Sequence, residues 1–61
     1  MTTPSIASTL ASMAVKRQGG NRIGQDKAAI YAAELVLDKQ SGATAVENGY
    51  REGMGLTPLT H

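Results

Sequence analysis

The most helical stretch of the chain is residues 26–39, DKAAIYAAELVLDK, which contains neither glycine nor proline. Five of its positions are good helix formers, namely Ala28, Ala29, Ala32, Ala33 and Leu35. Asp26 has the side chain of an N-cap, and Lys39 followed by Gly42 is a typical order of residues at a helix end. The stretch therefore predicts a helix over residues 26–39.

This helix would be apolar over more than half of its circumference. Its apolar residues form one face and a second edge, namely Ile30, Ala33, Leu37, Ala29 and Val36 on the face and Tyr31 and Leu35 on the edge. Only Lys27, Glu34 and Asp38 are left clearly solvated. Such a helix is normally central to a fold or covered by a partner. We therefore predict a protein interface at Ile30, Tyr31, Leu35 and Leu37.

A second helix is predicted over residues 4–17. Thr3 can act as N-cap, and proline at the first helical position loses no needed hydrogen bond. Ile6, Leu10 and Met13 share one stripe, which is the natural counterpart within the chain for helix 26–39. Lys16 and Arg17 lie in the last turn, where cations favour the helix dipole, and Gly19-Gly20 ends the helix.

The remaining segments are a loop, a short third element and a tail. Residues 18–25 form a glycine-rich basic loop, with Ile23 expected to anchor it on the core. Thr44 and Glu47 have the spacing of a capping box, which favours a short helix over about 45–53. Asn48-Gly49 is also a hairpin turn signal, so a hairpin remains the alternative. Residues 55–61 read as an irregular tail whose Leu56 and Leu59 could pack back on the domain.

Composition excludes most catalytic chemistry. The 61 residues contain no cysteine and a single histidine, His61, so disulfides, zinc sites and a buried Ser/His/Asp triad are not expected. Glu34 and Asp38 share a helix face, but two carboxylates alone make a poor metal site. We predict no catalytic residue, no metal and no cofactor. No segment approaches the roughly 18–20 apolar residues that span a membrane, and no secretory signal is visible.

Positive charge gathers in the first half of the chain, which carries +3 through residue 27 and −2 thereafter, summing to the net +1. This region is the candidate for contact with phosphate or with an acidic partner, through Lys16, Arg17, Arg22 and Lys27. No aromatic residue accompanies these cations, which argues against base stacking. A helix-turn-helix is disfavoured too, because its recognition helix would contain Gly53, Gly55 and Pro58.

Together these features predict one small all-α domain over residues 1–61, with two main helices, a short third helix and an irregular tail. The apolar surface of helix 26–39 exceeds what a 14-residue helix rich in alanine and serine can cover. We therefore expect a non-catalytic interaction or structural protein that binds copies of itself or a larger partner. It would be intracellular, without membrane contact, and minor proteins of phage particles are one such class. The alternative is a small nucleic-acid-binding regulator using region 16–27.

Overall fold

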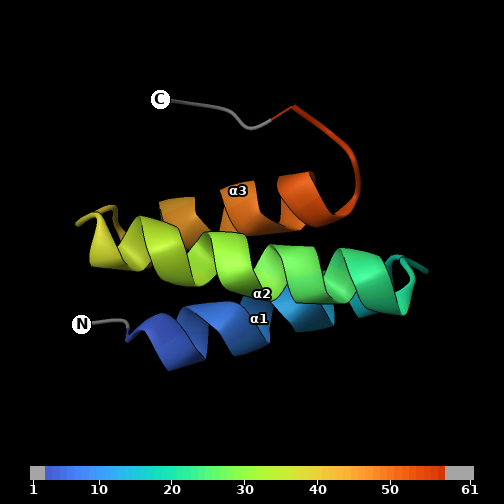
Figure 1. Cartoon of the computed structure of the whole chain (residues 1–61), viewed down its shortest axis with the longest axis horizontal. Coiled ribbons are helices and arrows are strands. Elements are labelled where there is room, and N and C mark those ends of the chain that lie inside the picture. Colours follow the sequence, from blue (N-terminus) through green and yellow to red (C-terminus); the bar gives the residue numbers. More distant parts are fainter. Residues whose placement is uncertain (1–2, 58–61) are drawn as a thin grey trace.

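In the computed structural model, which describes residues 3–57, the chain forms three α-helices and no strand. These are α1 (Pro4–Arg17), α2 (Arg22–Leu37) and α3 (Gly42–Gly53). Figure 1 shows α1 and α3 running in the same direction, with α2 antiparallel to both. Each helix packs against the other two. The predicted all-α class is confirmed, and residues 45–53 are helical, so the hairpin alternative is wrong.

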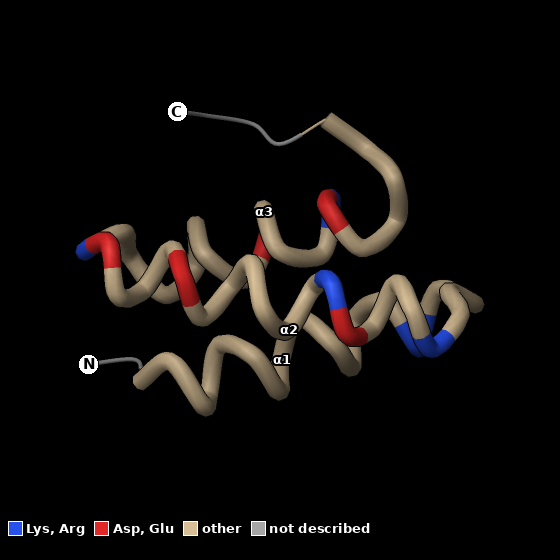
Figure 2. The backbone as a smooth tube through the Cα atoms, viewed as in Figure 1, with Lys and Arg blue, Asp and Glu red and all other residues tan. Residues whose placement is uncertain are grey.

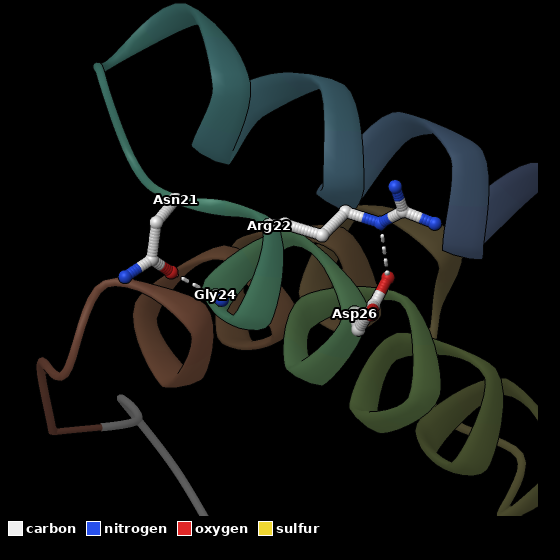
Figure 3. Close-up of polar contacts among 4 residues, drawn as sticks. All are labelled: Asn21, Arg22, Gly24 and Asp26. Atoms are coloured by element: carbon white, nitrogen blue, oxygen red, sulfur yellow. Dashed lines mark hydrogen bonds and ion pairs between the residues drawn. The ribbon is translucent and has the colours of Figure 1, made fainter.

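Each helix begins at a side-chain cap. The Thr3 hydroxyl accepts from the backbone N–H of Ile6 at 3.1 Å, and the predicted bounds of α1 are confirmed. The Asn21 amide oxygen accepts from the N–H of Gly24 at 2.8 Å, as Figure 3 shows. Because this cap lies five residues before Asp26, α2 starts at Arg22, and the predicted loop 18–25 shortens to residues 18–21.

The connection between α2 and α3 is also shorter than predicted. α2 ends at Leu37, with Asp38 as its C-cap, rather than at Lys39. α3 begins at Gly42, because the Ser41 hydroxyl, and not that of Thr44, caps it by accepting from the N–H of Thr44 at 3.2 Å. The Glu47 carboxylate therefore makes no capping box. It accepts instead from Arg51 Nε at 2.9 Å, one turn further along.

The residue after the α2 C-cap adopts a strained backbone. Lys39 has φ 67°, and the N–H groups of Lys39 and Gln40 donate back to Val36 and Leu35. The corresponding positions after α1 and α3 are Gly19 and Gly55, with φ 83° and 78°. This left-handed geometry costs a side-chain-bearing residue roughly 1–2 kcal/mol, and glycine nothing comparable.

We therefore expect Lys39→Gly to stabilise the protein by about 0.5–1 kcal/mol, the relief of strain being offset in part by the entropy that glycine gains in the unfolded chain. A urea unfolding curve measures the change. Gly19→Ala is the matched control, since nothing lies within 4 Å of a β-carbon at Gly19 and only the backbone is affected. That variant should lose stability, and a loss for Lys39→Gly would contradict the prediction.

The core is built from small residues at every fourth position of each helix. The fully buried apolar side chains are alanines and one valine, and the buried Gly24 and Gly49 and the half-buried Gly53 continue the same rows. Four-residue spacing keeps each row on one helix face. The rows are Ala7, Ala11 and Val15 on α1, Gly24, Ala28 and Ala32 on α2, and Ala45, Gly49 and Gly53 on α3.

These rows bring the helix backbones unusually close together. A β-carbon at Gly49 would lie only 2.8 Å from the carbonyl oxygen of Ala28, and one at Gly24 only 2.5 Å from that of Gly53. The Ser8 hydroxyl also donates to the carbonyl oxygen of Ala29 at 2.7 Å, which ties α1 to α2. Close approach is possible only because the facing residues have little or no side chain.

Seven large apolar residues, by contrast, are exposed, while Leu35, Val36, Val46, Tyr50 and Met54 pack partly buried against the core. Ile6, Leu10 and Met13 were expected to pack against α2 but are 44–50% exposed, because Ala7 and Ala11 occupy the face that meets the other helices. Ile23 was expected to anchor a loop on the core. It lies instead in the first turn of α2 and is 68% exposed.

Candidate interaction surfaces

The first candidate surface is the outer face of α2, formed by Ile23, Ile30 and Leu37. These residues are seven apart, or nearly two helical turns, so they follow one line along the helix. They are 68%, 62% and 71% exposed, and they lie opposite the row that faces the core. We call this line the α2 stripe.

The four residues predicted as a protein interface separate into two groups. Ile30 and Leu37 belong to the α2 stripe and are 62% and 71% exposed. Tyr31 is half-buried on the side of α2 that faces α3, and Leu35 packs against the core cluster. Of the four predicted interface residues, two are therefore exposed to solvent, and the other two are partly buried by contacts within the chain.

A shallow groove of about 190 Å³ runs beside the α2 stripe. Its lining contains apolar side chains from α2 and charged ends of both signs, namely Ile30, Tyr31, Lys27, Glu34 and Glu52. Lys27 and Glu34 are exposed and lie one turn to either side of Ile30. An apolar strip with opposite charges along its edge has the composition of a helix-packing surface.

The second candidate surface is the outer face of α1, which we call the α1 stripe. It consists of Ile6, Leu10 and Met13, and a hollow of about 220 Å³ lies between Ile6, Leu10, Ser5 and Thr9. Figure 2 shows no charged residue on α1 before its last turn. The α1 stripe is therefore apolar with an uncharged hydroxyl border.

The predicted basic region is divided by the fold. Lys16 and Arg17 end α1, and Arg22 begins α2 across the short turn 18–21, so these three cations share one end of the bundle (Figure 2). Arg22 Nε lies 3.4 Å from Asp26 Oδ1, an exposed pair drawn in Figure 3. Lys27 lies further along α2, in the groove with two glutamates.

The described residues show no arrangement for metal binding. No group of three or more His, Cys, Asp or Glu side chains within residues 3–57 could hold a metal ion. Glu34 and Asp38 are exposed. Among residues 3–57, no helix combines the length and apolarity needed to cross a membrane. Leu56 is 47% exposed, and Leu59, the other tail residue expected to pack back, lies outside the described residues.

Comparison with protein-family models, with curated proteins and with solved structures found no significant match to this chain.

One signal in the sequence could have located the interaction surfaces directly. Small residues recur every fourth position in all three helices, in the rows given above. Helices that pack through such rows turn their opposite sides, and with them their large apolar residues, to the outside. Assigning the core to alanine and glycine would have placed Ile23 on the surface together with Ile30 and Leu37.

Proposed function

We propose that this chain is a non-catalytic helical interaction protein, a structural or accessory subunit of a larger assembly. The observation that carries the proposal is the distribution of its apolar side chains. The fully buried apolar side chains are alanines and Val15, whereas seven large apolar residues are 44–71% exposed. Contiguous apolar surface on a small protein typically marks a binding site.

The free energy available from burying the exposed apolar residues favours binding through both stripes rather than through one. Full burial of an Ile or Leu side chain is worth roughly 1.5–3 kcal/mol, so covering the three residues of the α2 stripe would gain on the order of 4 kcal/mol per chain. Association costs at least about 4 kcal/mol in lost freedom of motion. A stripe on one chain alone therefore supports only weak binding, whereas engagement of both stripes supports a stable place in an assembly.

The partner that we propose is a protein. The α1 stripe has no charge and the α2 stripe is flanked by both signs, which suits packing against helices better than against phosphate. The assembly we propose is intracellular, in the cytoplasm or built into a particle such as a phage virion. Its localisation rests on the sequence alone.

The second candidate function is attachment to nucleic acid through the basic end of the bundle. Lys16, Arg17 and Arg22 favour it because the fold gathers them at one end. The Arg22–Asp26 pair reduces the net charge of this end, and Lys27 lies away from it. The interaction function therefore accounts for more of the surface.

Photocrosslinking tests the proposal. A photoreactive amino acid placed at position 10 or 30 of the full chain should give discrete protein adducts in the cells that naturally produce it. Position 16 is the control, because Lys16 is exposed but lies on neither stripe. Replacing Ile23 and Leu37 by glutamine should remove the adduct at position 30 and leave that at position 10.

The proposal fails if positions 10 and 30 yield no more adduct than position 16. Adducts confined to position 16 would favour attachment through the basic end instead. Circular dichroism of each variant checks that the helices remain. We expect them to remain because all of the substituted side chains are exposed, and none belongs to the buried core.

A further inference from the structure

We infer that the α2 stripe binds the same stripe of a second copy of this chain, with the two α2 helices antiparallel and a two-fold axis at Ile30. This inference rests on the proposed function and identifies one of its partners. Two features of α2 support it, namely the symmetry of the stripe and the order of the charges beside it, and the length of the contact sets its strength.

The α2 stripe is symmetric about Ile30. Ile23 lies seven residues before Ile30 and Leu37 seven residues after it, about 10.5 Å in each direction. A two-fold axis perpendicular to α2 at Ile30 therefore places Ile30 against Ile30 of the second copy. It places Ile23 against Leu37 at both ends, so every large residue of the stripe meets another.

The charges beside the stripe are antisymmetric about the same point. Lys27 precedes Ile30 by three residues and Glu34 follows it by four, and both lie on the flank that holds the groove. An antiparallel two-fold arrangement brings equal flanks together with their direction reversed. Lys27 of each copy then faces Glu34 of the other, which gives two equivalent ion pairs at the edge of the contact.

A parallel arrangement lacks this match. It would bring opposite flanks together, so Lys27 would face the Arg22–Asp26 pair, whose members already neutralise each other at 3.4 Å. Glu34 would face Ala33 and gain no cation. The order of charges along α2 therefore favours the antiparallel arrangement.

The length of the contact sets its strength. α2 has 16 residues, which gives a contact about 24 Å long and one helix wide. Stable protein pairs bury about 800 Å² on each partner, which would be a fifth of the 4016 Å² surface of this chain. A single helix pair covers less than that, so dimer formation should depend on protein concentration in the micromolar range or above.

Sedimentation equilibrium of the full chain tests the inference. The wild type should change from monomer to dimer with concentration. Lys27→Glu or Glu34→Lys alone should weaken the dimer roughly tenfold, because each places like charges together at two symmetric points. The double variant should recover the wild-type affinity, and an equimolar mixture of the two single variants should form a mixed dimer.

Matched variants separate the outcomes. Lys16→Glu changes the net charge as Lys27→Glu does, outside the stripe, and should leave dimerisation unchanged. Ile30→Asp should abolish the dimer with its helical circular dichroism retained, since Ile30 is 62% exposed. The inference is overturned if the chain stays monomeric at all concentrations. It is also overturned if the affinity of the dimer is unchanged by the charge-reversal variants and by Ile30→Asp. If the chain stays monomeric, adducts with other proteins at positions 10 and 30 would still support the proposed function.

Discussion

Gly49→Val is expected to abolish the cooperative unfolding transition of this protein. Gly49 lies where all three helices meet, and its first side-chain carbon would already lie 2.8 Å from both the Ala28 carbonyl oxygen and Ala32 Cβ. Carbon atoms normally approach no closer than about 3.5 Å. Because one obstacle is backbone, α2 and α3 must separate to make room.

The expected loss of folding free energy is as large as the whole stability of the domain. Overpacking a core costs typically 1–3 kcal/mol and more when the backbone must move, and a domain of this size has only a few kcal/mol of stability. Thermal melting followed by circular dichroism measures the loss. Ala43→Val is the control, because it introduces the same β-branched side chain at an exposed position of the same helix. Equal melting temperatures for the two variants would show that the close packing of α3 is wrong.

Val15→Ala is expected to cost about 2 kcal/mol, whereas Leu37→Ala should cost the isolated chain less than about 0.5 kcal/mol. Val15 is the largest fully buried side chain among the described residues, so removing its methyl groups leaves a cavity that alanine neighbours cannot fill. Leu37 is 71% exposed and loses little on truncation. Urea unfolding of dilute protein, where self-association is minimal, gives both values.

The two variants also distinguish folding from assembly. Leu37→Ala should weaken the antiparallel dimer proposed above while leaving the monomer folded. Val15→Ala should destabilise the monomer while leaving the residues of the stripe unchanged. Hydropathy alone would assign the larger stability loss to leucine. A large loss for Leu37→Ala in dilute solution would therefore contradict the outward placement of the α2 stripe.

The helices were largely predictable from local chemistry. Thr3-Pro4 and Gly19-Gly20 are unambiguous start and stop signals, and α1 has the bounds they predict. The start of α2 was missed because Asn21 and Gly24 read as loop residues by composition. In the structure they form a side-chain cap, and Gly24 continues as a core residue of the helix.

The candidate surfaces were only partly predictable, because periodicity identifies a helix face but not what covers it. The spacing of Ile30 and Leu37 predicts an apolar face, and that of Ile6 and Leu10 predicts its cover. This second prediction holds only where the largest side chains fill the interior. Gly49 and Gly53 looked unfavourable for a helix, yet their missing side chains allow α3 to approach α2.

The small-residue interior also affects how the stability of the folded chain depends on temperature. The heat capacity of unfolding rises with the apolar area that becomes exposed to water, and alanine and glycine contribute little of it. The curve of monomer stability against temperature is therefore flat. In the proposed association, covering the stripes would remove further apolar area from water, so association would add a heat-capacity change of its own. Because hydrophobic stabilisation weakens on cooling, lower temperature would weaken that proposed association.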